Sequence, residues 1–409
     1  MSAALLLASA CSSRPGFVHV EDGRFIRNGE PYGFVGTNFW YGPILASDGR
    51  GGDYDRLVRE LDTLKAIGLE NLRVMVGADG PDGDPFRVEP ALQTAPGVYN
   101  DTLLLGLDRF MAELGKRGMQ AVLYLNNSWE WSGGYGRYIE WTTGEKALLP
   151  LVDGYKPYTM QMQKFQTNKA AQELFFNHIR AIVGRTNSVT GKPYSEDPAI
   201  FSWQISNEPR CFSDDPEIRA GFIGWLSESA RLIKELDPNH MVSTGSEGLI
   251  GCEIDPELLE QVHSIGDIDY MTIHIWPYNW RWVQADRLTE DLDKVFAMTD
   301  EYIGLNREVA LRHGMPVVVE EFGYPRDGFS EHREAATTGR DRFYEHIIAL
   351  VSDGTLDGAN FWGWSGFAEP EHSEWKPGDD YTADPPHEPQ GLYGVYVTDS
   401  STVEIIKQF

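Results

Sequence analysis

Two glutamates stand where the sequence predicts that a buried strand meets a loop. Glu208 follows the apolar run 199–205, AIFSWQI, and Pro209, which has no N–H to give to a sheet, ends that strand. Glu321 ends a second run, VVVEE, at 317–321. Such runs are typical of strands buried on both faces, and parallel α/β barrels hold their reacting groups at the carboxyl ends of these strands. Two carboxylates placed in this way predict the acid–base and nucleophilic chemistry that breaks a glycosidic bond.

The alternative is that both are ordinary loop glutamates, because most glutamates are solvated surface groups. The residues around them favour the functional interpretation, since polar and aromatic side chains follow almost every predicted strand. So many large aromatic residues on loops would leave exposed apolar patches, and aromatic faces stack on the C–H faces of sugars. The strand-end residues are Asn38, Trp40, Arg73, Asn126, Asn127, Trp129, Trp131, Asn207, Arg210, Glu247, His274, Trp276, Tyr278, Trp362 and Trp364.

Alternating strand and helix patterns predict an α/β fold, a (β/α)8 TIM barrel preceded by an N-terminal β-hairpin at 17–32. The alternative, an open doubly wound sheet, is weak because no Gly-rich phosphate loop follows an early strand. We expect long, structureless and functional loops at 126–166 and 363–398. Strands are expected at 33–38, 71–76, 119–125, 199–205, 241–244, 270–275, 316–321 and 359–362, and helices at 54–67, 103–114, 168–183, 216–236, 292–313, 340–351 and 402–408.

The predicted chemistry gives each carboxylate a different protonation state. Glu208 needs a raised pKa so that it can protonate the leaving oxygen, and Glu321 must stay ionised to attack the anomeric carbon, with Arg73 beside it. Asn207 is expected to bind the sugar 2-OH and His274 to hold the nucleophile, and the stereochemical outcome is expected to be retention.

The neighbouring Glu320 has the opposite strand parity to Glu321. Strict alternation therefore predicts that its side chain points away from the barrel axis.

The composition limits the partners of the chain. The 409 residues carry a formal net charge of -27, which argues against nucleic acid or an anionic membrane surface as a partner. The mechanism requires no metal and no cofactor. The acidic loop residues Asp379, Asp380 and Asp384 are either a calcium site or, as we prefer, a solvated loop. We expect a monomer.

The N-terminus, MSAALLLASAC, is similar to the end of a signal peptide with a bacterial lipobox. This predicts a leader and tether at 1–16, a lipid on Cys11 as the one membrane contact, and a single catalytic domain at 17–409. The protein would then be exported, as a periplasmic or surface lipoprotein or as a secreted protein. The alternative is that the N-terminal segment is a disordered tail. Cys211 and Cys252 form either a disulfide or two buried free thiols, and they lack the histidine pattern of a zinc site.

The motifs together resemble glycoside hydrolase family 5. WQISNEPR carries the family's Asn-Glu-Pro, VVVEEFG its Glu-aromatic-Gly, and Arg73, His274 and Trp362 fall where the family has its arginine, histidine and strand-8 tryptophan. GTNFWYG, LNNSWEWSGGYGRYIEW, NEPRC and HIWPYNW are similar to the endo-β-1,4-mannanase subfamily. The resemblance implies cleavage of internal β-1,4 bonds in mannan, glucomannan or galactomannan by a retaining two-glutamate mechanism.

The resemblance also implies binding roles for several residues. Arg210 would line the leaving-group side, Trp362 would lie under the sugar at the cleavage point, and Trp40, Trp129 and Trp131 would line the cleft. One position departs from the family pattern: Trp276 stands two residues after His274, where many members have Tyr. A hydroxyl that touches the nucleophile is then either absent or supplied by Tyr278.

Three alternatives to an endo-mannanase remain open from the sequence. An exo-acting or mannobiose-releasing β-mannanase would need long loops that close one end of the cleft. A β-1,4-endoglucanase would use the same barrel. A non-catalytic glycan-binding surface lipoprotein would keep the tryptophans but would not need both Glu208 and Glu321.

Overall fold

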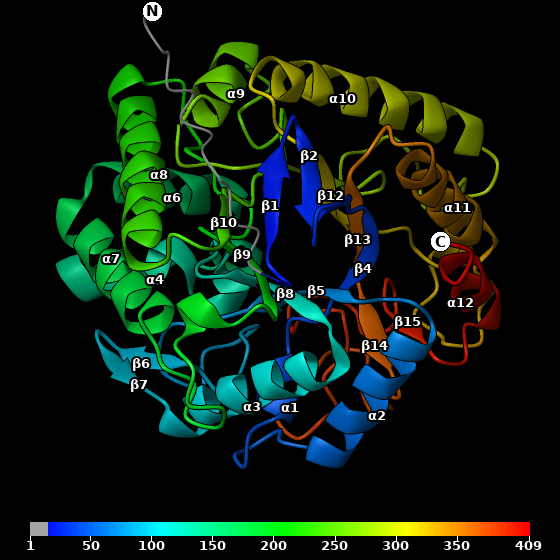
Figure 1. Ribbon diagram of the computed structural model, residues 1–409, viewed down its shortest axis with the longest axis horizontal. Helices are drawn as coiled ribbons and strands as arrows, with labels where there is room; N and C mark the ends of the chain where they lie inside the picture. Colours follow the sequence, from blue (N-terminus) through cyan, green and yellow to red (C-terminus); the bar gives the residue numbers. More distant parts are fainter. Residues whose placement is uncertain (1–14) are drawn as a thin grey trace, which may run out of the picture.

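The computed structural model describes residues 15–409, and the predictions for Cys11 and the leader fall on residues outside that range. Eight parallel strands form one sheet in the order β10-β9-β8-β5-β4-β13-β12-β11 (Figure 1). The expected TIM barrel is therefore confirmed. The strands are β4 (Phe34–Asn38), β5 (Asn71–Met75), β8 (Gln120–Tyr124), β9 (Ile200–Gln204), β10 (Met241–Ser243), β11 (Met271–Ile275), β12 (Val317–Phe322) and β13 (Gly358–Phe361).

Backbone hydrogen bonds just outside the named strands join β10 to β11 and close the barrel. The N–H of Asp269 donates to the carbonyl of Val242 at 2.9 Å, and the N–H of His274 donates to the carbonyl of Glu247 at 3.1 Å. The ends of β9, β11, β12 and β13 therefore surround one opening, where the predicted site residues converge.

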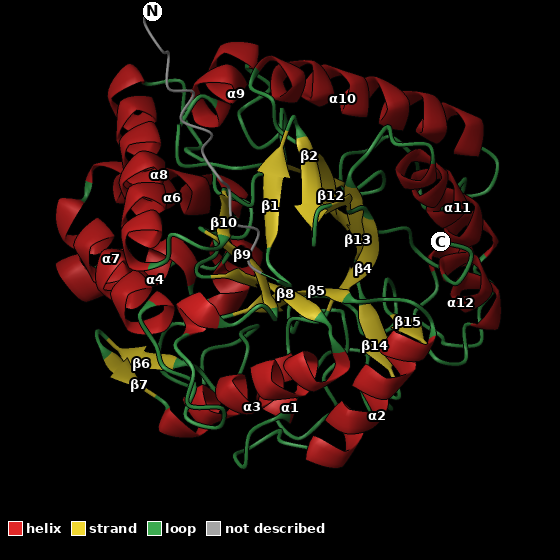
Figure 2. Ribbon diagram, in the orientation of Figure 1, coloured by secondary structure: helices red, strands yellow, loops and turns green. Residues whose placement is uncertain are grey.

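Helices surround the barrel (Figure 2), and local signals fix their starts. Asp53 accepts the N–H of Arg56 at the start of α2, and Asp215 caps α8, whose first residue is Pro216. The outer helices are α2 (Tyr54–Ala66), α3 (Asp101–Arg117), α7 (Lys169–Val183), α8 (Pro216–Leu236), α9 (Pro256–His263), α10 (Leu292–Arg312), α11 (Thr338–Ser352) and α12 (Ser400–Ile406).

The expected N-terminal hairpin, β1 (Val18–Glu21) and β2 (Arg24–Arg27), is extended by β3 (Glu30–Pro31) and covers one end of the barrel (Figure 1). Phe25 from β2 is fully buried, and its ring packs edge-on against Phe201 and Tyr270 inside the barrel at 5.2 and 5.4 Å. This aromatic layer closes the amino-terminal end of the barrel, opposite the opening that holds the site.

The prediction of structureless long loops is wrong for 126–166. This segment forms α4 (Gly134–Thr143), α5 (Pro150–Asp153) and α6 (Tyr155–Thr167). Tyr158, Met162 and Phe165 on α6 are buried at helical spacing, so packing of an apolar face explains this helix.

Segment 363–398 is mostly irregular, apart from β14 (Trp364–Gly366) and β15 (Val395–Tyr396). The remaining short elements are α1 (Gly42–Leu45), β6 (Gln93–Ala95), β7 (Val98–Tyr99) and three 3-10 turns, Glu130–Ser132, Tyr194–Glu196 and Asp327–Phe329.

A β-bulge in β12 overturns the predicted orientation of Glu320. Ile273 pairs with Val319, but the next residue, His274, pairs with Glu321, so Glu320 is the extra residue. Val318 lies in the interior cluster of the barrel, and Glu320, two residues further on, points to the same interior. Because of the bulge, the side chain of Glu321 also points inward, toward the opening of the barrel. The carboxyl groups of Glu320 and Glu321 therefore both lie within the barrel.

Two further sequence expectations concern cysteines and membranes. Cys211 and Cys252 are both buried free thiols, so the disulfide alternative is not formed in the structure. Within residues 15–409, no helix is both long and apolar enough to span a bilayer.

Candidate active site

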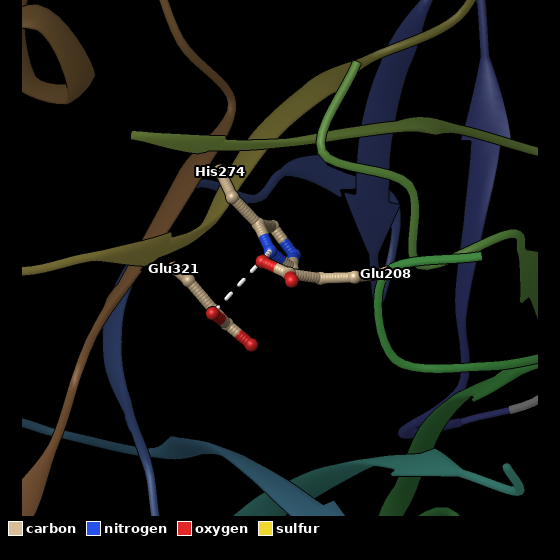
Figure 3. A group of neighbouring side chains, drawn as sticks. All are labelled: Glu208, His274 and Glu321. Carbon is tan, nitrogen blue, oxygen red and sulfur yellow. Dashed lines mark hydrogen bonds and ion pairs between the residues drawn. The ribbon is translucent and has the colours of Figure 1, made fainter. Parts of the chain in front are cut away.

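Three side chains from different strands meet at the carboxyl end of the barrel. Glu208 comes from the loop after β9, His274 from β11 and Glu321 from β12 (Figure 3). One carboxylate oxygen of each glutamate and one ring nitrogen of the histidine all lie within 4.8 Å of one another. Glu208 has a φ of 47°, a left-handed conformation that costs energy for a residue with a side chain and that is often found at functional sites.

Glu321 is held by two N–H donors and a histidine. Arg73 Nη1 donates to Oε1, and the indole N–H of Trp276 donates to Oε2 at 3.2 Å. Nδ1 of His274 lies 3.3 Å from the same Oε2. Trp276 thus makes the contact that the sequence left open. Tyr278 does not supply it, because its ring packs against Phe329 at 4.4 Å in a neighbouring cavity.

The Arg73 guanidinium connects the nucleophile to the predicted 2-OH ligand. Its Nη2 donates to Oδ1 of Asn207 at 2.7 Å, its Nη1 to Oδ1 of Asn38 at 3.1 Å, and its Nε to Gln204 at 2.8 Å. The group also lies 4.6 Å above the ring of Tyr124. Because each of its three nitrogens donates to a fixed partner, the guanidinium holds its position without substrate.

The hydrogen-bond partners of the Glu208 carboxyl group include no arginine. The indole N–H of Trp129 donates to its Oε2, and Nδ1 of His274 lies 2.8 Å from its Oε1. Burial raises the pKa of both glutamates. Arg73 contacts Glu321 but not Glu208, which favours the ionised form of Glu321 and the protonated form of Glu208.

Histidine 274 is a neutral spacer between the two carboxyl groups. Burial lowers the pKa of His274 to about 4. Its Nε2 is buried and has no hydrogen-bond partner among the described residues. The imidazole is therefore uncharged at neutral pH and fixes the separation of the two glutamates through Nδ1.

Glu208 and Glu321 border a cavity of about 530 Å³. On the Glu208 side, the Arg210 guanidinium lies 5.8 Å from the ring centre of Trp129, and its Nη2 donates to Glu247 at 2.6 Å. Trp131 and Trp362 stand edge to face at 6.4 Å on another wall. The predicted residues that line the cavity are Trp129, Trp131, Asn207, Glu208, Arg210, Glu247, Trp276, Glu321 and Trp362.

Other predicted residues lie behind this lining. Trp40 is buried and stands edge to face with Trp131 at 5.8 Å, so it supports the wall. Asn127 accepts the backbone N–H of Trp129 at 2.9 Å and faces Asn207 at 3.2 Å. Trp364 donates to Glu60 at 2.7 Å, away from the cavity.

The sequence did not single out several residues that line the cavity. Pro385, His387 and Glu388 from segment 363–398 form part of its wall, and Leu151 and Tyr155 from the α5–α6 region lie at its rim. Nδ1 of His387 and Oε2 of Glu388 are buried without a hydrogen-bond partner in residues 15–409. Burial raises the pKa of Glu388 to about 8. The length of that segment was the only signal for these residues, and it does not say which of them turn inward.

Two groups within the described residues bring three potential metal donors together. In the first, Glu208, His274 and Glu321, the charge of Arg73 at the same carboxylate opposes a second cation. The second, Glu371, His372 and Asp379, is largely exposed, and Asp379 already accepts the backbone N–H of Lys376 at 3.0 Å. The calcium alternative gains no support, because Asp384 is likewise used as an acceptor for backbone N–H groups.

The sequence model described as GH family 5 beta-mannosidase-like matches residues 15–409. The chain belongs to this family. It is therefore a glycoside hydrolase, which is the enzyme class that the paired glutamates predicted.

Similar proteins of known sequence and structure agree with membership of this family. The chain is 34% identical to a family 5 mannosidase from Rhizomucor miehei, with a TM-score of 0.87 and 96% of each chain covered. It is 30% identical to mannan endo-1,4-beta-mannosidase 1 from Solanum lycopersicum, over 88% of this chain and 86% of that protein. An endo-1,4-beta-mannanase from Rhizomucor miehei shares the fold, at 22% identity and a TM-score of 0.68, with 96% of this chain and 98% of that chain covered.

Proposed function

We propose that this family 5 enzyme hydrolyses β-1,4-mannosidic bonds with retention of the anomeric configuration. The observation that carries the proposal is the close pair of carboxyl groups, Glu208 and Glu321, with oxygens within 4.8 Å of each other. Retaining glycosidases hold the two groups about 5–5.5 Å apart, whereas inverting enzymes leave roughly 6.5–9.5 Å for a water molecule. The short separation favours direct attack by one carboxylate.

The contacts support a different role for each group. Glu208, with no direct arginine contact, protonates the glycosidic oxygen, and the bond between the anomeric carbon and that oxygen breaks. Glu321, held by Arg73 and Trp276, attacks the anomeric carbon from the other face and forms a glycosyl ester. Glu208, now ionised, takes a proton from water, which attacks the same carbon and releases Glu321. Asn207, held by Arg73, is placed to bind the 2-OH.

The relatives support mannose as the sugar at the cleavage point. The curated relatives are mannan endo-1,4-beta-mannosidases, at 28–30% identity. A mutant of the Rhizomucor miehei mannosidase was solved in complex with mannosyl-fructose. For the present enzyme we propose linear β-1,4-mannan, its glucose- or galactose-containing forms, and the oligosaccharides derived from them.

One observation favours action at chain ends over action at internal bonds. Pro385, His387 and Glu388 border the same cavity as both glutamates, so segment 363–398 forms part of the wall of the site. An internal bond needs a groove that is open on both sides. We therefore place exo action, or release of short products, ahead of the endo action that the sequence resemblance implies.

Product analysis by mass and chromatography tests this proposal. Linear mannan, glucomannan, galactomannan and cellulose are each incubated with the wild type and with Glu321→Ala. Mannose or mannobiose alone in the first minutes supports chain-end action, and a ladder of manno-oligosaccharides supports endo action. Both patterns must be absent from the variant. Cleavage of cellulose but not of mannan would overturn the substrate, and the absence of any product would overturn the function.

A further inference from the structure

Glu320 is a third carboxyl group inside the site, and the mechanism above does not use it. Its side chain is completely buried, and Oε2 lies 3.3 Å from Nε of Arg73. The hydroxyl of Tyr270 donates to Oε1 at 3.3 Å. Asn38 donates to the Glu320 carbonyl oxygen at 2.9 Å, which fixes the bulge. Arg73 therefore touches two adjacent carboxyl groups, Glu320 and Glu321.

The hydrogen bonds around Glu320 leave acceptors without donors. Nε of Arg73 is already directed to Gln204 at 2.8 Å, and Oε2 of Glu320 has no hydrogen-bond donor within the described residues. Oδ1 of Asn360, on the neighbouring strand β13, is also a buried acceptor without a donor. A protonated Glu320 carries an O–H group, which supplies a donor among these buried acceptors. An ionised Glu320 has only acceptor oxygens and supplies none.

The charges of the site balance only when Glu320 is neutral. In the resting enzyme, Arg73 carries one positive charge and Glu321 one negative charge, while Glu208 holds its proton and His274 is uncharged. In the glycosyl-enzyme, Glu321 is an ester and Glu208 carries the negative charge. An ionised Glu320 would add an uncompensated buried charge at both stages, and buried charges that lack a partner are costly.

We propose that Glu320 is a positioning residue that keeps its proton during turnover and so reserves the charge of Arg73 for Glu321. This inference rests on the proposed function for its role in turnover, but the protonation state can be measured without substrate. The groups that face Glu320 are Arg73 from β5, Tyr270 preceding β11 and Glu321 from β12.

The electrostatics agree with this geometry. Burial raises the pKa of Glu320 to about 7; Arg73, Tyr270 and Asn360 oppose the increase, and Glu321 adds to it. The neutral form therefore dominates at mildly acidic pH. Above neutral pH, ionisation would place a second negative charge beside the nucleophile and compete for Arg73.

The acid limb of the pH profile tests the role in turnover. Glu320→Gln keeps a neutral side chain, so we expect kcat to fall by no more than about threefold and the acid-limb midpoint of kcat/KM to stay within about 0.3 units of wild type. If Glu320 were ionised in the wild type, the variant would remove a like charge next to Glu321 and lower that midpoint by about one unit or more. The latter result would overturn the proposal. Glu301→Gln, on the exposed face of α10, is the matched control.

Infrared spectroscopy tests the proton directly. The difference spectrum of wild type minus Glu320→Gln at mildly acidic pH should contain the carbonyl stretch of one protonated carboxylic acid, and this band should disappear above neutral pH. A carboxylate band at mildly acidic pH would contradict the proposal, even if the enzyme proved inactive on mannosides. If the glutamine variant does not fold, Glu320→Leu, which is also uncharged, takes its place in both measurements.

Discussion

Each residue of the reacting pair has a distinct set of contacts, and these predict different losses on substitution. Glu208→Ala removes the acid that protonates the leaving group, so kcat for unactivated manno-oligosaccharides should fall by about 10²- to 10⁴-fold. For aryl mannosides whose leaving group needs no proton, the loss in kcat/KM should be much smaller, and azide, which attacks without a base, should restore the kcat that slow hydrolysis of the glycosyl-enzyme lowers. Glu301→Ala on the surface should behave as wild type. An equal loss on both substrate types would contradict the assignment of Glu208 as the acid.

The sequence left open whether the hydroxyl beside the nucleophile is absent or supplied by Tyr278, and in the described residues no tyrosine hydroxyl donates to Glu321 and Trp276 takes that place. Its indole N–H donates to the nucleophile, so Trp276→Phe should lower kcat roughly tenfold by removing one hydrogen bond to a charged group. The acid limb of kcat/KM should move to higher pH, because the ionised form of Glu321 loses a donor.

A tyrosine at the same position provides the conservative variant for this test. Trp276→Tyr again carries a polar hydrogen and should recover part of the activity and of the acid-limb position. Equal pH profiles for the wild type and the phenylalanine variant would show that the indole N–H does not act on the nucleophile.

At the scale of elements, the sequence predicted all eight strands and their order in the chain, because buried strands and amphipathic helices have clear periodic patterns. It did not predict the bulge at Glu320, since alternation assumes an unbroken ladder and no local residue type marks the extra residue. It also missed α4 and α6 in segment 126–166. The aromatic residues of this segment pack into the core, and the sequence analysis assigned them to a loop and not to the apolar face of a helix.

The α5–α6 region gives the cavity an exposed aromatic residue at its rim. Tyr155 is 55% exposed, lines the cavity and lies 6.3 Å from the ring of Trp129. Tyr155→Ala should raise KM for longer manno-oligosaccharides by about 3- to 10-fold, close to ~1 kcal/mol, and leave kcat nearly unchanged. Met160→Ala, exposed on the same helix but outside the cavity lining, is the control. Unchanged KM values in the tyrosine variant would remove this rim from the binding site.

At the scale of the whole molecule, a buried ion pair and its neighbouring hydrogen bonds connect segment 363–398, which forms part of the cavity wall, to the barrel. Both terminal nitrogens of Arg326 donate to Asp399, at 2.8 and 2.7 Å, and Nε of Arg326 donates to the carbonyl of Gly391 at 3.0 Å. Asp399→Ala leaves a buried guanidinium without its partner, so the free energy of unfolding should fall by about 3–5 kcal/mol. Glu404→Ala, on the exposed face of α12, is the control, and equal denaturant midpoints for the two variants would contradict this role.

The pH dependence of stability offers a second test at this scale. The folded-state pKa of Glu320 is raised from 4.5 to about 7, so its contribution is fully present below the ordinary pKa and is lost as pH rises through about 7. As the pH rises from about 4.5 to about 7, the unfolding free energy of the wild type should therefore fall by about 3 kcal/mol relative to that of Glu320→Gln. Denaturant titrations of both proteins across this range measure the difference. A constant difference would show that Glu320 does not titrate there.

The central claim is that Glu321 attacks the sugar directly, with Glu208 as acid and then base. The most direct measurement is proton NMR of the first product released from an aryl β-mannoside, recorded before the free sugar mutarotates. We predict that the β-anomer of mannose appears first and then equilibrates. The α-anomer as first product would show inversion, and it would contradict the two-step mechanism whatever polysaccharide the enzyme cleaves.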